Sequence, residues 1–370
     1  MKNIKRHIAL LLLLSVAILG GCVRRPLEVI YRSTVRVIVK CIWSVESYPE
    51  GQKPTGVTFY FFRDGEFYTS LTTANVDSCE VHLEKGHYRM YMISQSPEEF
   101  WKMDFENMNS FSNAATTLRE TKATWATRGE GEVPVENPEI LLAGVTEEFD
   151  ITEEMSEEYQ YYYSQLRRIL AAESGGTKAV SLDEKTYYQE QVEYHTLRIP
   201  VYPKNIVSQM WVTIYAGNAD VLKSVRASTS GMARTWELTR GVTSGDEAIQ
   251  IINQWNLTID DPARRVGHID GIINTFGLPN GEMPSGDRDP SLNVSALLID
   301  NTTAVDYIFP VGDKISILEP NRGYRHLYRL IFGSVDNPAI TPPDVKPVSG
   351  GGMDAQVTDW EEGETIEIPM

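Results

Sequence analysis

Hydrophobic and polar side chains alternate along much of this chain. In the first such segment, Val35, Val37 and Val39 fall on one face of an extended chain, and Arg36 and Lys40 fall on the other. A period of two with β-branched residues is typical of a half-buried β-strand. Short apolar segments of the same kind follow at 57–62, 67–71, 79–83, 87–93, 138–143 and 148–152. Tight turns between such strands predict an antiparallel β-sandwich.

The second half of the chain also consists mainly of short apolar segments that predict strands. Strands are predicted at 192–202, 210–216, 221–228, 235–238, 269–276, 292–299, 305–309 and 324–332. The tail segment 365–368 suits a closing strand or hairpin, whereas residues 95–139 have no regular period. We therefore predict an all-β protein of two antiparallel β-sandwich domains in tandem, with a short helical insertion.

The helical insertion is predicted where the period changes. Apolar residues recur there at i, i+3 and i+4, namely Met155, Tyr159, Tyr162, Leu166 and Ile169. Thr152 can cap this helix and the pair Gly175-Gly176 can end it. The aromatic stripe could bind a partner, but packing against the protein's own sheet is favoured. Residues 153–187 are thus a helical connector or insertion.

The N-terminus carries an export pattern. Lys2, Lys5 and Arg6 precede an apolar run of twelve residues, 8–19, interrupted only by a serine. A membrane-spanning helix needs roughly 20 residues, so the run indicates a secretory signal. The sequence Leu19-Gly20-Gly21-Cys22 resembles the bacterial lipobox, which implies cleavage before Cys22 and lipidation of its thiol. The alternative is an ordinary secreted protein with a cysteine near its cleavage site.

These patterns divide the chain into five parts. A short tether after Cys22 would reach roughly 40 Å when fully extended, which keeps the first domain near the membrane. The predicted parts are a signal peptide (1–21), a lipidated tether (22–33), an N-terminal sandwich (34–152), the helical connector (153–187) and a C-terminal sandwich (188–370).

The remaining cysteines, Cys41 and Cys79, fall on the inward faces of their predicted strands. An exported protein lies where disulfides persist, so a Cys41–Cys79 bridge is one interpretation. Two buried free thiols are the other, because cysteine is a common core residue. The sequence leaves both open.

Charge narrows the classes of partner. The chain has 34 basic and 51 acidic residues, a formal net charge of −17. Without residues 1–21, which hold three basic residues and no acidic one, 31 basic and 51 acidic residues leave −20. Such a surface argues against nucleic acid and against electrostatic docking on anionic lipid.

Motifs for catalysis, metal or cofactor binding are missing from the sequence. There is no Gly-x-Ser-x-Gly elbow, no His-Glu-x-x-His and no Cys-x-x-Cys. His82 and His87 flank a predicted turn and are expected to be exposed, and Asp287-Arg288-Asp289 is expected to be a solvated loop. We predict no enzyme, metal or cofactor. A secreted glycosidase remains a weak third class, because a carboxylate pair leaves no local motif.

Nearly the whole mature chain resembles the fimbrillin superfamily of Bacteroidota, in particular its FimB-like anchor and minor-subunit lipoproteins. The features that carry the resemblance are the lipobox, the strands at 34–43, 56–62 and 138–143, the hairpin at 81–88, and the C-terminal segments 357–360 and 366–368. The resemblance implies two transthyretin-like sandwiches in tandem and a role in pili assembled by strand donation.

In that superfamily, shaft subunits lose their first strand by cleavage after an arginine, whereas anchor subunits keep the lipid and the strand. Arg32 and Arg36 lie where such a cut could fall, yet the short tether favours a retained base. Family members displayed outside the cell often have acidic residues after the lipidated cysteine. Here Val23-Arg24-Arg25-Pro26 follows, which leaves the membrane face open.

Two function hypotheses follow. The first is an outer-membrane lipoprotein, anchored by lipid on Cys22, that acts as an anchor or accessory subunit of a fimbria-like (type V pilus) assembly through β-strand addition in cell adhesion. Its partners would be the membrane and other fimbrial subunits. The alternative is a surface glycan-binding lipoprotein of a polysaccharide uptake system. Trp101, Trp125 and Trp360 are the aromatic residues expected to be exposed for that role.

Overall fold

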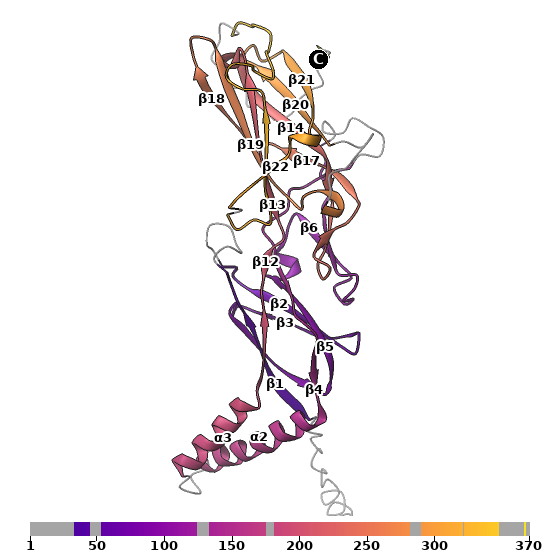
Figure 1. Cartoon of the computed structure of the whole chain (residues 1–370), viewed down its shortest axis with the longest axis vertical. Helices are drawn as coiled ribbons and strands as arrows, with labels where there is room; N and C mark the ends of the chain where they lie inside the picture. The colour runs from indigo at the N-terminus through magenta and orange to yellow at the C-terminus, as the bar shows by residue number, and fades with distance from the viewer. Residues whose placement is uncertain are drawn as a thin grey trace, which may run out of the picture.

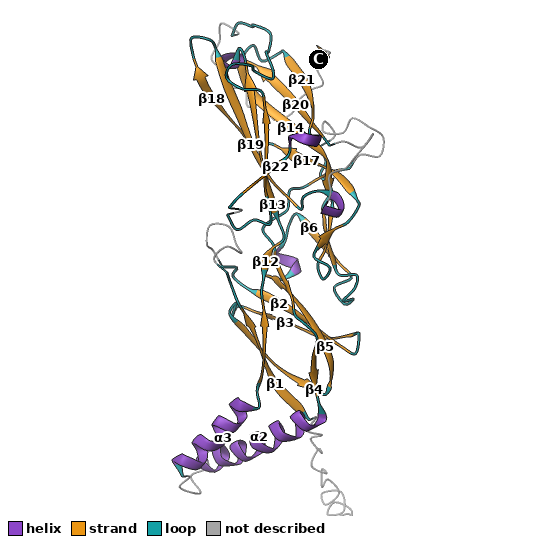
Figure 2. Cartoon of the chain, viewed as in Figure 1, coloured by secondary structure: helices purple, strands orange, loops and turns teal. Residues whose placement is uncertain are grey.

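The molecule is elongated, with two β-rich halves end to end and a helical hairpin crosswise at one end (Figure 1). The computed structural model describes residues 33–44, 53–123, 133–174, 181–281, 290–320 and 322–347, and the backbone of 366–367. Strands dominate the regular structure (Figure 2). The signal peptide, Cys22 and the tether up to residue 32 lie outside the described residues.

Two sheets form the N-terminal sandwich. The first has the order β11-β1-β4, and the second has the order β12-β9-β5-β2-β3, with β10 also paired to β5. Their strands are β1 (Thr34–Cys41), β2 (Val57–Arg63), β3 (Glu66–Thr73), β4 (Ser78–Glu84), β5 (Gly86–Ser94), β9 (Leu142–Val145), β10 (Phe149–Ile151), β11 (Leu197–Val201) and β12 (Lys204–Asn205). All pairs are antiparallel except β1 with β11.

The predicted alternation builds the core of this sandwich. Val35, Val37 and Val39 are fully buried and pack with Phe59 and Phe61 of the facing sheet. A period of two places these side chains on one face, because successive residues of a strand point to opposite sides. Burial of each large side chain contributes roughly 1.5–3 kcal/mol.

The C-terminal sandwich also has two sheets, in the orders β18-β19-β13-β23-β22 and β24-β21-β20-β14-β17-β8. Their strands are β8 (Pro134–Val135), β13 (Ser208–Ala216), β14 (Leu222–Ala233), β17 (Glu247–Ile252), β18 (Trp255–Asp261), β19 (Val266–Thr275), β20 (Ser291–Leu298), β21 (Ala304–Pro310), β22 (Ser316–Leu318), β23 (Leu327–Phe332) and β24 (Ile366–Glu367). The predicted closing strand is therefore present as β24, which runs parallel to β21. The predicted all-β class, with two sandwiches in tandem and a helical insertion, is confirmed.

Exchanged segments join the two halves. The strands β6 (Met103–Glu106) and β7 (Ala115–Leu118) form a sheet with β15 (Thr235–Glu237) and β16 (Val242–Thr243), and β8 pairs with β17. A shared core cluster contains Phe62 and Tyr91 from the first half and Trp236 and Phe276 from the second. The irregular segment 95–139 thus builds the junction.

The chain returns to the first sandwich beyond the predicted boundary at residue 188. Strand β11 pairs with β1, and β12 pairs with β9, so the chain enters the second sandwich only after Asn205. A strand was predicted from residue 192, but residues 192–194 complete a helix and β11 begins at Leu197. Local apolar content at 192 misled the prediction, since the buried side of that helix includes Val192.

The insertion is a hairpin of two helices, α2 (Glu153–Ser174) and α3 (Leu182–Tyr194). As predicted, Thr152 caps α2, because its Oγ1 accepts a hydrogen bond from the backbone N–H of Met155 at 3.2 Å. The stripe residues Tyr159 and Leu166 join the core cluster of the first sandwich, so the stripe packs on the protein's own sheet. α3 extends the insertion to residue 194.

Candidate interaction surfaces

The start of β1 is fastened to α2 at one end of the molecule. The backbone oxygen of Ser33 accepts a hydrogen bond from the Ser156 hydroxyl at 3.1 Å, and that of Thr34 accepts one from the Gln160 amide at 2.8 Å. β1 is also the central strand of its sheet, paired with β4 on one side and β11 on the other. Its removal would therefore dismantle the sheet and release the hairpin.

Arg36 locks the hairpin onto the outer face of this sheet. Its guanidinium donates to Glu80 of β4 at 2.7 Å and to Glu193 of α3 at 2.5 Å, and its side chain is 23% exposed. The hydrogen bond to Glu80 raises the pKa of Arg36 and, in return, lowers the pKa of Glu80. Because Arg36 lies inside a doubly paired strand, the folded state shields it from a protease. Arg32, the other arginine considered for cleavage, lies outside the described residues.

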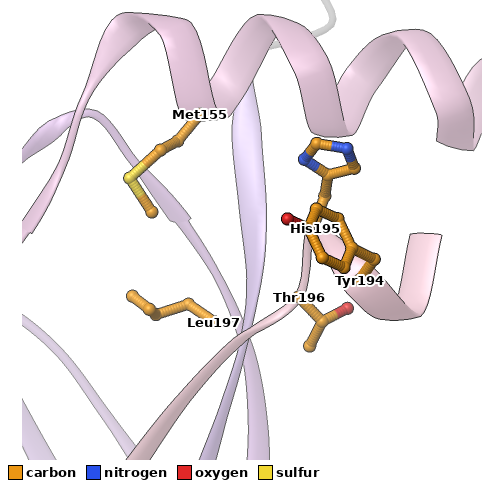
Figure 3. A pocket seen from close by; sticks show the side chains of 5 residues that line it. All are labelled: Met155, Tyr194, His195, Thr196 and Leu197. Carbon is orange, nitrogen blue, oxygen red and sulfur yellow. The ribbon is translucent and has the colours of Figure 1, made fainter. Parts of the chain in front are cut away.

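A small pocket of about 150 Å³ opens between α2, the end of α3 and the start of β11. Its lining consists of Met155, Tyr194, His195, Thr196 and Leu197 (Figure 3). The His195 ring stacks on Tyr162 at 4.9 Å, and its Nδ1 lies 3.3 Å from a Glu158 oxygen. Among the residues that line this pocket, no nucleophile is paired with a base.

The second sandwich lies at the end of the molecule away from the helical hairpin (Figure 1). After Ile252 the chain crosses from one sheet to the other, so β17 pairs with β14 only from Ala227 onward. Among the described strands, the first five residues of β14, 222–226, pair with β20 alone, and β18 pairs with β19 alone. We call the stretch between these two strand edges the opening.

Apolar side chains of β18 lie on the inward face of its sheet. Leu257 lies opposite the buried core residue Ile269, so it shares the inward face, yet it is 42% exposed and Ile259 is 38% exposed. Trp255 closes one end by packing over Gly271, where a Cβ would approach its ring to 2.9 Å. An edge with exposed apolar residues is a ready template for an added strand.

Trp101 is a separate exposed feature near the junction. Its side chain is 78% exposed, while the neighbouring Phe100 is buried in the junction core. One Glu139 oxygen accepts hydrogen bonds from the backbone N–H groups of Trp101 and Lys102, both at 3.0 Å, and Arg119 donates to the Trp101 carbonyl at 2.7 Å. The exposure expected for Trp101 is confirmed. Trp125 and Trp360 lie outside the described residues.

Part of the chain matches a known protein family. The sequence profile of a family described as "Domain of unknown function (DUF5119)" matches residues 21–253. The chain belongs to this family. No curated protein matches it significantly in sequence.

Two solved structures are similar to this chain, and the first of them shares its fold. A protein described as a "putative adhesin" from Bacteroides ovatus is 14% identical, with 88% of this chain and 99% of that chain covered and a TM-score of 0.50. The fimbrial anchor protein Mfa2 from Porphyromonas gingivalis is 10% identical over 80% of this chain and 90% of that chain, with a TM-score of 0.43. The first of these structures shows that the fold implied by the fimbrillin resemblance is shared with a known protein.

The two predicted cysteine partners lie on adjacent strands with free, buried thiols. Cys79 lies opposite Val39, so Cys41 is its diagonal neighbour. Diagonal Cα atoms are roughly 7–8 Å apart, beyond the roughly 4.4–6.8 Å usual for a disulfide. The bridge stays a prediction that would require the strands to shift. Burial raises the pKa of both thiols to about 12.

The pairing around His87 was not visible in the sequence. As expected, His87 is exposed, but it lies in β5 beside the turn, with its Nδ1 2.7 Å from an Asp150 oxygen and its Nε2 3.0 Å from a Glu148 oxygen. These carboxylates come from the chain around β10, more than 60 residues away. Among the described residues, no group of three or more His, Cys, Asp or Glu could hold a metal ion, and no helix has the length and apolarity to cross a membrane.

Proposed function

We propose that this protein is an outer-membrane lipoprotein, held by lipid on Cys22, that serves as an anchor or accessory subunit of a fimbria-like assembly in cell adhesion. It binds a neighbouring subunit by β-strand addition and has no enzymatic role. A fold shared with a "putative adhesin" supports the adhesive role, because that protein spans nearly the same length.

The observation that carries the proposal is the separation of two features along the molecule (Figure 1). β1 begins at one end, directly after the tether that leads from Cys22, and the open edge between β14 and β18 lies in the sandwich at the other end. An anchor needs this arrangement, because one end is held by lipid while the other must remain accessible. The double pairing of β1 supports retention of the first strand.

The strand edges of β18 and β14 could stabilise an added strand in two ways. An incoming strand would gain backbone hydrogen bonds at the edge of β18 or at residues 222–226 of β14. Its apolar side chains would cover Leu257 and Ile259 and remove their exposed surface from water, at roughly 25 cal/mol per Å².

Membrane retention and assembly are tested separately. Changing Cys22→Ser should release the protein from the membrane fraction. A Leu257→Lys and Ile259→Lys double variant should stay in the membrane but co-purify several-fold less with pilus-like polymers, because charge at the edge opposes strand pairing. The matched control is Ile272→Lys, which is 51% exposed on the opposite face of the same sheet. If purified polymers lack the protein and its deletion leaves their attachment unchanged, the fimbrial role is wrong.

A second role, glycan binding at Trp101, is supported by its 78% exposure and by the three hydrogen bonds that hold its backbone. A fixed, exposed indole can stack on a sugar ring. Trp101→Ala should abolish retardation in polysaccharide affinity gels, whereas Tyr202→Ala, at a residue 61% exposed, should not. No retardation of the unmodified protein across a broad panel would exclude this role.

A further inference from the structure

Three exposed tyrosines lie on the helical hairpin, one on α2 and two on α3. Tyr161 is 57% exposed, Tyr187 is 49% exposed and Tyr194 is 80% exposed. Tyr161 follows the buried Tyr159 by two residues, and Tyr194 follows the buried Val192 by two. Two residues correspond to about 200° on a helix, so Tyr161 and Tyr194 lie away from the buried sides of their helices, with Tyr194 at the small pocket beside β11. We name Tyr161, Tyr187 and Tyr194 the tyrosine face.

Ring contacts hold part of this face in place. His195 stacks on Tyr162, and Tyr194 contacts His195 edge-on, with ring centroids 5.1 Å apart. Tyr161 contacts Tyr162 in the same way, also at 5.1 Å. The exposed rings are therefore supported by partly buried ones, which lowers the conformational entropy lost when they bind a surface.

The position of the hairpin decides what can cover the face. Its helix α2 holds Ser33 and Thr34 through hydrogen bonds, so it lies where the described chain begins. Only ten residues, 23–32, separate Ser33 from Cys22. Fully extended they reach roughly 35 Å, about the length of α2 itself at 1.5 Å per residue. A protein held by lipid on Cys22 therefore keeps this hairpin close to the bilayer.

We propose that the tyrosine face docks on the headgroup layer of a phospholipid bilayer and so sets the orientation of the long axis on the membrane. This inference rests on the proposed lipid anchoring. Tyrosine suits that layer, because its ring is apolar and its hydroxyl is hydrated. The hairpin crosses one end of the molecule, as a foot would (Figure 2).

Charge selects the lipid. The two helices carry nine acidic and three basic residues, a formal charge of −6. Some of this charge is paired within the protein, as in the ion pairs of Glu173 with Lys185 and of Glu193 with Arg198. The remaining negative charge repels anionic headgroups, so the tyrosine face should prefer zwitterionic phosphatidylethanolamine. Added anionic lipid should weaken the docking.

Residue-resolved tyrosine iodination tests the docking. The lipidated full chain is reconstituted in phosphatidylethanolamine–phosphatidylcholine vesicles and compared with the soluble Cys22→Ser protein. Tyr187 and Tyr194 should be labelled several-fold more slowly on vesicles than in solution. Tyr202 is the matched control, because it is 61% exposed and follows β11, roughly 16 Å along the strand from the hairpin. Its labelling should not change.

Each outcome has one meaning. If the lipidated protein is on the vesicles but Tyr187 and Tyr194 react there as fast as in solution, docking is wrong and the anchoring proposal stands. If the protein never attaches to vesicles, the anchoring proposal itself fails. Slow labelling of Tyr194 in the Cys22→Ser protein as well would overturn membrane docking, because something other than the bilayer would then cover the face.

A variant separates docking from a change in folding. A Tyr187→Ser and Tyr194→Ser double variant should keep its lipid attachment and its thermal unfolding midpoint, since both residues are exposed. On vesicles, the backbone amides of its hairpin should exchange hydrogen as fast as they do in solution, whereas those of the unmodified protein should exchange several-fold more slowly. Equal protection in both proteins would contradict the proposal.

Discussion

Arg36 in β1 and Glu193 in α3 form an ion pair with Nη1 and Oε1 2.5 Å apart, although 157 residues separate them in the sequence. The contact ties the strand nearest the tether to the last turn of the hairpin. Force applied through the tether would therefore reach the hairpin and the sheet together, rather than a single loose strand.

The first prediction concerns this pair. Arg36→Met should lower the free energy of unfolding by about 1 kcal/mol, because Glu80 loses its charged partner and Glu193 keeps only Arg198. Hydrogen exchange of the α3 amides should rise relative to that of β13. The control is Arg240→Met, whose 66% exposed side chain pairs with Glu237 and should contribute almost nothing. Unchanged exchange in α3 would show that the pair does not hold the hairpin.

The second prediction concerns the two buried thiols. Their pKa values rise from 9.0 to about 12 on folding, because burial disfavours the thiolate. The folded state therefore binds protons that the unfolded state releases above pH 9. Stability that is fully present below pH 9 should fall as the pH rises toward 12. Urea unfolding between pH 8 and 11 should show a shallower fall for Cys79→Ala than for the unmodified protein.

The same thiols allow the disulfide to be decided. Iodoacetamide at pH 8 should leave Cys41 and Cys79 unmodified in the folded protein, and should modify both after unfolding without reductant. Modification that requires a reductant after unfolding would establish the Cys41–Cys79 bridge instead.

The third prediction concerns the junction. Trp236→Ala should lower the free energy of unfolding by roughly 3–5 kcal/mol, because a nearly fully buried indole leaves a cavity among Phe276 and its neighbours. Limited proteolysis should then release fragments from both halves, since the exchanged strands make them one unit. Trp101→Ala, at an exposed indole, should change stability by less than about 0.5 kcal/mol. Cleavage confined to one half would mean that the halves are independent.

The fourth prediction concerns the open side. Gly271→Ala places a Cβ 2.9 Å from side-chain atoms of Trp255 and of Ile252, so the Trp255 ring must move away from β19. We expect the free energy of unfolding to fall by roughly 1–3 kcal/mol and the tryptophan emission to shift to the red. Gly312→Ala is the control, because open space surrounds that glycine. An unshifted emission spectrum in the Gly271→Ala variant would show that Trp255 does not close the opening.

Local patterns were enough for much of the fold. Alternation around Val35, Val37 and Val39 predicted β1, and the stripe through Tyr159 and Leu166 predicted α2, because periodicity directly reflects which face is buried. The exposure of Trp101 was also expected from sequence. α3 was missed, since its inward side offers little beyond Val192 and its helical period is weak.

The sequence by itself determined the strand faces, the main helix and the short distance from Cys22 to the first strand. Only the tertiary structure decided which strands meet: β7 with β15, β1 with β11, and the gap beside β14 that leaves Leu257 exposed. The physical reason is the separation along the sequence of the residues that interact. Periodicity is set by neighbours a few residues apart, whereas strand pairing depends on the whole chain closing loops of more than 100 residues into one core.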